Sequence, residues 1–81
     1  MMIRVRLFAV ARQVAGREEV ELEVPEPATV AQVREHLARA VPALGNLADR
    51  FLFAVNSEYA DDTTTIPSAA EVACIPPVSG G

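Results

Sequence analysis

The sequence predicts a single α+β domain, with a mixed β-sheet covered on one face by one long helix. Apolar and charged residues alternate with period two in residues 3–8 and 18–24, as in half-buried strands. Apolar residues recur at helical spacing in residues 30–44. Two leading strands, a crossover helix and returning strands give one mixed sheet of about five strands. The length of 81 residues fits one such domain.

Residues 3–8 and 18–24 are expected to form two antiparallel strands. In the first, Ile3, Val5 and Leu7 face one side, and Arg4, Arg6 and Phe8 face the other. Between the strands, residues 9–15 suffice for one or two helical turns, and Gly16 fits the left-handed position that closes such a turn. Phe8 is an aromatic on a face of arginines. It is either tucked under a loop or an exposed apolar anchor for a partner.

A capping box of Thr29 and Gln32 predicts the start of the long helix. Pro42 disfavours helical geometry at Val41, so the helix is expected to end there. The apolar stripe comprises Val30, Val33, Leu37, Ala40, Val41 and Leu44. Arg34, Glu35 and Arg39 are expected on the solvent side, and His36 is interpreted as structural or solvated.

The second half of the chain is expected to supply three strands after a loop at residues 44–50. The apolar run of residues 51–55 predicts a strand inside the sheet or covered on both sides. A turn at residues 56–58, a short edge strand at residues 59–60 and a core side chain at Ile66 are expected next. In the last strand, at residues 71–75, Val72 and Cys74 share one face, and Ala73 and Ile75 share the other.

Cys74 is interpreted as a buried, inert filler, and a reactive sulfur on Cys74 is the alternative. One cysteine excludes an internal disulfide framework and gives no metal-ligand cluster. The net charge of −4, from 11 acidic residues and seven arginines without a lysine, argues against nucleic-acid binding. No signal peptide and no apolar stretch of membrane-spanning length are visible, so a soluble cytoplasmic protein is expected.

The last six residues form the most specific motif of the sequence. Two prolines end the strand and stiffen the exit, and two glycines leave a tip without side-chain bulk. Six extended residues reach on the order of 20 Å. Such a tail suits insertion into a narrow pocket of another protein, with the Gly81 carboxylate as the functional group; a frayed end without a role is the alternative. The motif is Pro76-Pro77-Val78-Ser79-Gly80-Gly81.

The chain resembles the small subunits of molybdopterin synthase, a family of ubiquitin-like sulfur carriers with the β-grasp fold. The resemblance rests on Leu7-Phe8-Ala9 with Arg12 and Gly16, on Ala54-Val55-Asn56, and on the last strand with the terminal hexapeptide. It covers essentially the whole chain. The sequence departs from the family at Gln13, in the turn of residues 67–70, and at Ile75, where an aromatic residue is common.

This resemblance implies a β-grasp domain at residues 1–75 and an extended C-terminal tail at residues 76–81. It also implies that the first and last strands are parallel neighbours at the centre of the sheet. Phe8 and Ile75 are then expected side by side at the base of the tail, with Tyr59 nearby. We therefore expect these three residues to form an apolar docking patch.

The resemblance further implies a mechanism centred on Gly81. An adenylyltransferase related to ubiquitin-activating enzymes uses ATP and magnesium to adenylate Gly81, and a sulfur donor protein converts the adenylate into a thiocarboxylate. Residues 76–80 then lead Gly81 into the large subunit of molybdopterin synthase, where sulfur passes to cyclic pyranopterin monophosphate for the molybdenum cofactor. The chain is expected to bind no cofactor or metal, to be no enzyme on its own, and to assemble as two plus two subunits.

Three other functions remain open at this point. The first is a sulfur carrier for another product, namely the thiazole of thiamine, a thiolated tRNA base or cysteine. A ubiquitin-like modifier joined to target lysines is a second alternative. An interaction module with an incidental tail is the third.

Overall fold

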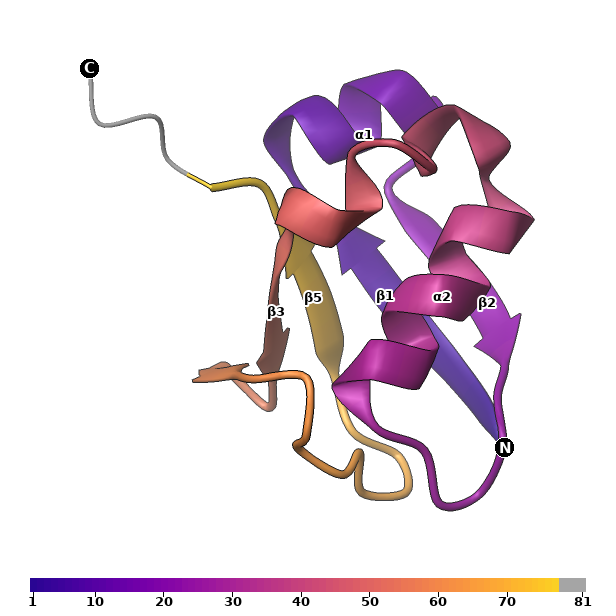
Figure 1. The fold of residues 1–81 in the computed structure, drawn as a ribbon, viewed down its shortest axis with the longest axis vertical. Helices are drawn as coiled ribbons and strands as arrows, with labels where there is room; N and C mark the ends of the chain where they lie inside the picture. The colour runs from indigo at the N-terminus through magenta and orange to yellow at the C-terminus, as the bar shows by residue number, and fades with distance from the viewer. Residues whose placement is uncertain (78–81) are drawn as a thin grey trace.

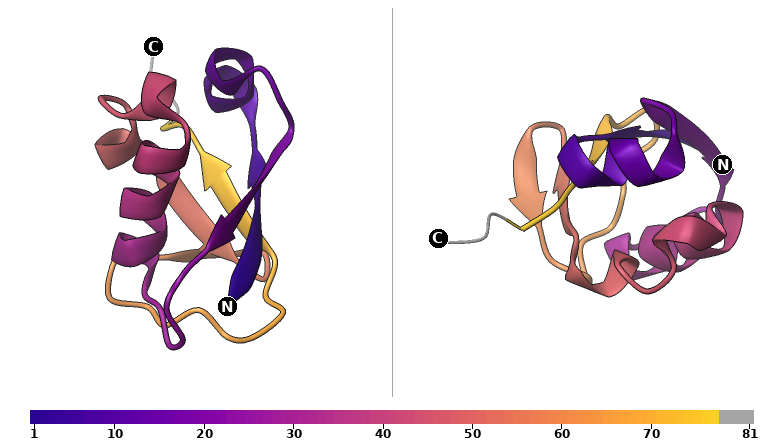
Figure 2. Two further views of the ribbon diagram at one scale, coloured as in Figure 1. Left: turned by 90° about the vertical axis from the view of Figure 1, so that its right-hand side faces the viewer. Right: turned by 90° about the horizontal axis from the view of Figure 1, so that it is seen from above.

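A five-stranded mixed β-sheet forms the centre of the fold, and one long helix packs on one of its faces (Figures 1 and 2). The structure is a computed structural model and describes residues 1–77. Its elements are β1 (Met2–Leu7), α1 (Ala9–Ala15), β2 (Glu19–Glu23), α2 (Val30–Ala40), η1 (Pro42–Leu44), η2 (Ala48–Arg50), β3 (Leu52–Val55), β4 (Glu58–Ala60) and β5 (Val72–Ile75). The predicted α+β class is confirmed.

Strands β1 and β2 form an antiparallel pair, as their alternating sequences predict. The register runs from Met2 opposite Glu23 to Arg6 opposite Glu19. In both strands every second side chain is buried. Between them, α1 ends at Gly16, whose φ of 74° is left-handed and whose N–H donates to the carbonyl of Arg12 at 2.9 Å. This is the predicted glycine closure of a short helix.

Helix α2 begins with the predicted capping box. The backbone N–H of Thr29 donates to Oε1 of Gln32 at 2.9 Å, and the backbone N–H of Gln32 donates to Oγ1 of Thr29 at 3.4 Å. The helix ends at Ala40, before Val41 and Pro42, as expected. Ala40 is exposed, so its assignment to the apolar stripe was wrong. Because the helix stops there, the buried Leu44 reaches the core from the 3-10 turn η1 instead.

Strand β5 lies at the centre of the sheet, in the order β2-β1-β5-β3-β4. It runs parallel to β1, with Val72 opposite Val5, and antiparallel to β3, with Val72 also opposite Val55. Strands β3 and β4 form a hairpin through the left-handed Asn56 and Ser57. The strand order, with the first and last strands parallel at the centre, confirms the predicted β-grasp fold.

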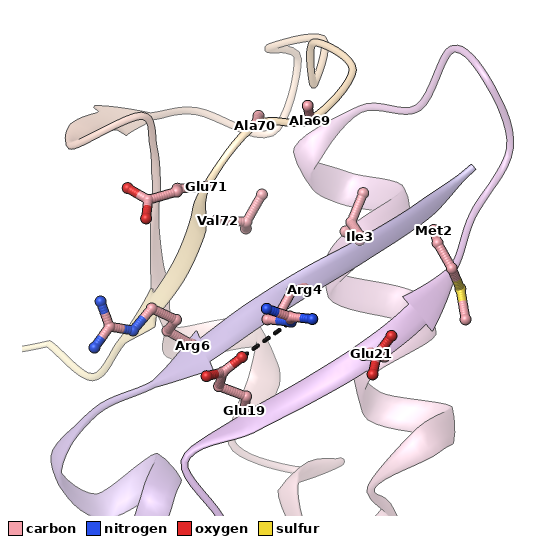
Figure 3. A pocket seen from close by; sticks show the side chains of 10 residues that line it. All are labelled: Met2, Ile3, Arg4, Arg6, Glu19, Glu21, Ala69, Ala70, Glu71 and Val72. Carbon is pink, nitrogen blue, oxygen red and sulfur yellow. Dashed lines mark ion pairs between the residues drawn. The ribbon is translucent and has the colours of Figure 1, made fainter.

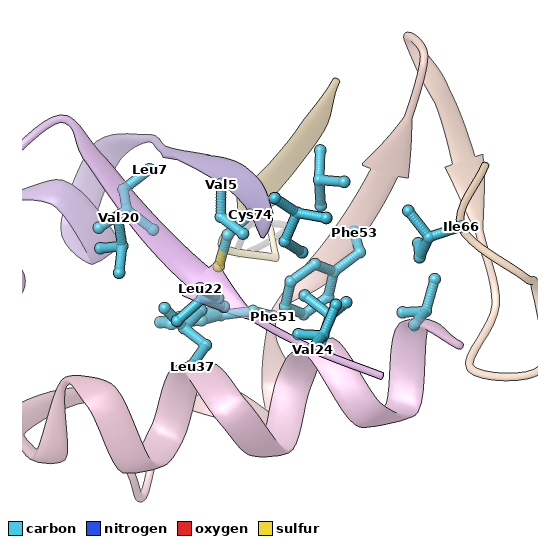
Figure 4. Close-up of a cluster of buried hydrophobic side chains, with 14 of the residues drawn as sticks. Val5, Leu7, Val20, Leu22, Val24, Leu37, Phe51, Phe53, Ile66 and Cys74 are labelled. Atoms are coloured by element: carbon cyan, nitrogen blue, oxygen red, sulfur yellow. The ribbon is translucent and has the colours of Figure 1, made fainter. Parts of the chain in front are cut away.

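The core lies between this sheet and α2 (Figure 4). It contains Phe53 and Cys74 from the central strands and Leu37 from the helix, each at most 1% exposed. Ile66, predicted as a core side chain of an otherwise polar loop, is 3% exposed. The predicted loop at residues 44–50 begins at the last residue of the 3-10 turn η1 and ends with the 3-10 turn η2, and Leu44 and Ala48 are buried.

Arg34 does not lie on the solvent side of α2, where the helical pattern placed it. Its Nη1 donates to the carbonyls of Ala48 and Phe51 at 2.6 and 2.7 Å, and its Nη2 pairs with Asp62 at 2.8 Å. Its guanidinium also stacks 4.9 Å from the centre of the Phe53 ring. The long apolar stem lets the charged group reach these carbonyls, which need donors beside the core.

Candidate functional site

The face of the sheet opposite α2, here called the open face, has a charged half and an apolar half. Strands β1 and β2 carry the charged half, and β5, β3 and β4 carry the apolar half. The charged side chains are Arg4, Arg6, Glu19, Glu21 and Glu23. The boundary between the halves runs along β1 and β5, the two central strands.

Three apolar side chains form a row at the end of β5, here called the apolar row: Phe8, Ile75 and Leu52. Leu7 pairs with Cys74, and the N–H of Phe8 donates to the carbonyl of Cys74 at 3.2 Å, so Phe8 lies beside Ile75. On the other side of β5, Leu52 pairs directly with Ile75. Phe8 is 40% exposed and Leu52 is 46% exposed. The structure thus brings Phe8 and Ile75 together, as predicted from the parallel strands.

Tyr59 lies in the next row of the sheet and not in the apolar row itself. It pairs with Ala54, which in turn pairs with Ala73 of β5. Tyr59 is 70% exposed at the free edge of the sheet. Leu52 is therefore its diagonal neighbour, within reach of an aromatic side chain. Tyr59 flanks the apolar row, while Leu52 occupies the position beside Ile75.

Leu52 is the member of this surface that was not predicted. The continuous apolar run of residues 51–55 predicted a strand inside the sheet or covered on both sides, and β3 does lie inside the sheet, between β5 and β4. Within that run, however, Phe51, Phe53 and Val55 alternate and are all buried on the helix side. The same alternation leaves Leu52 facing outward, and this signal was available in the sequence.

A shallow hollow lies next to the apolar row. Its lining comes from β1, β3 and β5, from the residues next to the ends of β1 and β5, and from the β3–β4 turn: Arg6, Phe8, Ala54, Ser57, Glu71, Val72 and Ala73. The two alanines face each other across β3 and β5 and leave space between larger neighbours. An apolar side chain of a partner therefore fits beside Phe8.

The chain leaves the sheet after Ile75, at the end of the sheet where α1 lies (Figure 1). Pro76 is half-buried and Pro77 is exposed. The other predicted tail residues, Val78, Ser79, Gly80 and Gly81, lie outside the described residues. The base of the tail is thus next to the apolar row, because Pro76 follows Ile75 directly.

The Cys74 thiol faces the core and is fully buried (Figure 4). Burial raises the pKa of Cys74 to about 12, and the charge of Arg34 opposes this rise more weakly. A thiol with this pKa stays protonated at neutral pH and is a poor nucleophile. The geometry therefore favours the inert filler over a reactive sulfur on Cys74.

His36 and the acidic residues do not form a catalytic constellation. The Nδ1 of His36 lies 2.7 Å from the carbonyl oxygen of Gln32, one helical turn earlier, which fits a structural role. Among residues 1–77, no group of three or more histidine, cysteine, aspartate or glutamate side chains is arranged to hold a metal ion. In the same part of the chain, no helix has the length and apolar character needed to cross a bilayer.

Comparison with known proteins gives matches over almost the whole chain. Residues 5–81 match the model of the ThiS family. The molybdopterin synthase sulfur carrier subunit of Chlamydomonas reinhardtii is 37% identical over 83 residues, covering 100% of both chains. The subunit of the same name from Arabidopsis thaliana is 34% identical over 79 residues, covering 98% of this chain and 82% of the relative. The crystal structure of SAMP1 from Haloferax volcanii superimposes with a TM-score of 0.84 at 32% identity, covering 100% of both chains.

Proposed function

Because this chain belongs to the ThiS family, we propose that it is the sulfur carrier, and the small subunit, of a molybdopterin synthase. The observation that carries the proposal is the likeness to subunits of that name over nearly the full chain. The terminal hexapeptide supports it, because its two glycines suit a pocket that admits only backbone. The chain's own residues supply docking, reach and the reacting group, while the catalytic pocket belongs to the large subunit.

The chemistry takes place at the carboxylate of Gly81. A carboxylate is a poor electrophile, so an activating enzyme with ATP and magnesium first forms the Gly81 acyl-adenylate and releases pyrophosphate. Sulfur at the oxidation level of sulfide, delivered by a donor protein, then attacks the acyl carbon, AMP leaves, and a thiocarboxylate remains. In the large subunit this sulfur is transferred to cyclic pyranopterin monophosphate, and water restores the carboxylate. We propose that this cycle runs in the cytoplasm.

The fold supports this role by presenting a docking surface on the sheet, next to the base of the tail at Pro76. The apolar row and the flanking Tyr59 are the proposed contact with the large subunit, which extends the predicted patch of Phe8, Tyr59 and Ile75 by Leu52. Pro76 and Pro77 limit the directions in which the tail leaves this surface. Docking of the row therefore directs Gly81 toward one pocket.

A second candidate function is that of a protein modifier joined to lysines of other proteins. The likeness to SAMP1, a small archaeal modifier protein, favours it. Both functions start from the same Gly81 adenylate and differ in the attacking nucleophile, which is sulfur in one case and an amine in the other. Covalent adducts on other proteins in its own cells distinguish the modifier from the carrier.

The test is the intact mass of untagged protein from its own cells, with fragmentation to locate any change. We expect a species that is heavier by the mass difference between sulfur and oxygen, located at Gly81. An added sulfur on Cys74 would contradict the mechanism. So would an unchanged carboxylate after incubation with ATP, the activating enzyme and a sulfur source.

A variant of the tip tests the narrow pocket. Gly81→Ala adds a single Cβ and is expected to stop activation or transfer, because a tunnel that admits only backbone excludes it. The matched control is Glu35→Gln, a small change of an exposed side chain on α2 that lies outside the docking surface and leaves the tip unaltered. Normal turnover by Gly81→Ala would refute the narrow pocket.

A further inference from the structure

Arg6 lies on the open face at the boundary between its charged and apolar halves. On β1 it is opposite Glu19 of β2 on one side and Ala73 of β5 on the other. It is exposed, and its guanidinium carbon is 5.6 Å from the centre of the Phe8 ring. Arg6 therefore places a positive charge directly next to the apolar row.

Among residues 1–77, no ion pair includes Arg6, although a glutamate is its direct neighbour across the strands. That glutamate, Glu19, pairs with Arg4 instead: Nε of Arg4 lies 3.1 Å from Oε2 of Glu19 (Figure 3). In the same view the guanidinium of Arg6 extends away from Glu19, toward β5. Arg12, which also borders this region, pairs with Glu18 at 3.7 Å. Arg6, whose charge borders the apolar row, is thus left open to a carboxylate from outside.

Arg6 also lines the hollow beside the apolar row, together with Phe8, Ala54 and Ala73. A partner whose apolar side chain enters this hollow covers one side of the guanidinium. Covering a charge without a counter-charge is unfavourable, so the fitting partner presents a carboxylate at this point. The surrounding Glu19 and Glu71 favour basic residues around that carboxylate.

We propose that Arg6 pairs with a carboxylate of the large subunit, beside the apolar contact at the base of the tail. The inference rests on the proposed function, because it takes the large subunit as the partner of the open face. The partner surface it describes has an apolar side chain for the hollow, one acidic residue for Arg6 and basic residues around them. In this arrangement the apolar row supplies affinity, and Arg6 fixes the orientation in which the tail enters.

The experiment compares two substitutions with the same change in charge. Arg6→Gln is expected to weaken binding to the purified large subunit by about tenfold to thirtyfold and to reduce its salt dependence. Arg39→Gln is the matched control, because Arg39 is exposed on α2, on the other side of the sheet. The control is expected to change affinity by about twofold or less. Calorimetric titration at low and at near-physiological salt measures both.

Arg6→Met separates the charge of Arg6 from its stacking on Phe8. If the charge binds a carboxylate, Arg6→Met weakens binding as Arg6→Gln does. Binding of Arg6→Met at the wild-type level would overturn the proposal, because the apolar stem alone would then suffice. A charge reversal gives a second supporting result. Arg6→Glu is expected to weaken binding, and changing one acidic residue of the large subunit to lysine is expected to restore the affinity.

The two proposals fail in different ways. If Arg6→Gln binds like Arg39→Gln while Phe8→Ala still weakens binding, the Arg6 pair is wrong and the sulfur carrier remains. If wild-type protein neither binds the large subunit nor acquires a thiocarboxylate at Gly81, the proposed function itself is wrong.

Discussion

Strand β5 presents two apolar faces, and only one of them is covered. On the helix side, Val72 and Cys74 are at most 1% exposed under α2. On the open face, Ala73 and Ile75 are half-buried, and the neighbours of Ile75, Phe8 and Leu52, are exposed. Both faces arise from the same alternation along one strand. The covered face stabilises the domain, and the uncovered face is available to a partner.

The largest expected effect is on the free energy of unfolding, and it compares two neighbouring residues of β3 whose side chains lie on opposite faces of the sheet. Phe53→Ala removes a fully buried ring and is expected to lower the free energy of unfolding by about 3–5 kcal/mol. Leu52→Ala removes an exposed side chain on the open face and is expected to cost less than about 1 kcal/mol. Urea unfolding followed by circular dichroism measures both. Equal losses would remove the distinction between the faces.

The second prediction concerns binding at the open face. Phe8→Ala is expected to weaken binding to the large subunit by about 2 kcal/mol, roughly thirtyfold, while stability changes by less than about 1 kcal/mol. Met2→Ala is the matched control, because Met2 is 60% exposed on the same face at the other end of β1. Calorimetric titration of each variant measures the affinity. An unchanged affinity of Phe8→Ala would show that the row is not a docking surface.

The third prediction uses the titration of Cys74 on the covered face. Burial raises the pKa of Cys74 from 9.0 to about 12, so above pH 9 the unfolded chain loses the thiol proton while the folded chain keeps it. This contribution to stability is complete below pH 9 and is lost as the pH rises toward 12. The expected slope is about 1.4 kcal/mol per pH unit. Urea unfolding of wild type and Cys74→Ala across this range measures it, and parallel curves would contradict it.

The smallest expected effect comes from weakening helix α2, which covers the buried face of the sheet. Thr29→Ala removes the hydroxyl that caps α2 and is expected to cost about 1 kcal/mol of stability without changing the open face. Thr29→Ser keeps the capping oxygen and is the control. Thermal unfolding measures the loss, and binding to the large subunit is expected to stay unchanged. A loss of affinity for Thr29→Ala would mean that the two faces are coupled.

Most of the fold was predictable because it depends on local patterns. Alternation placed β1 and β2, the capping box and Pro42 bounded α2, and the hexapeptide indicated the family. The matches to the ThiS family and to sulfur carrier subunits confirm that resemblance. The neighbouring positions of Phe8 and Ile75 followed from the parallel order of the first and last strands.

What was not predictable depends on contacts between segments distant in the sequence. Arg34 was misplaced because the carbonyls it binds belong to the 3-10 turn η2 and to the residue that follows it, 14 and 17 residues later. The row in which Tyr59 lies is set by the register of the β3–β4 hairpin, which depends on the left-handed turn at Asn56 and Ser57. Arg6 has no ion-pair partner in residues 1–77 because Arg4 pairs with Glu19, the glutamate opposite Arg6. Single-strand patterns do not contain this information.

The central position of β5 also affects how the molecule is made. Since the ribosome synthesises β5 last among these five strands, β1 and β3 have no partner between them until β5 has been made. Pairing Val5 with Val72 closes a loop of nearly the whole chain, which is slow compared with forming a hairpin. A product that stops before Val72 leaves two unpaired strand edges and is exposed to proteases and aggregation. Topology therefore couples completion of the fold to synthesis of the strand that carries the tail.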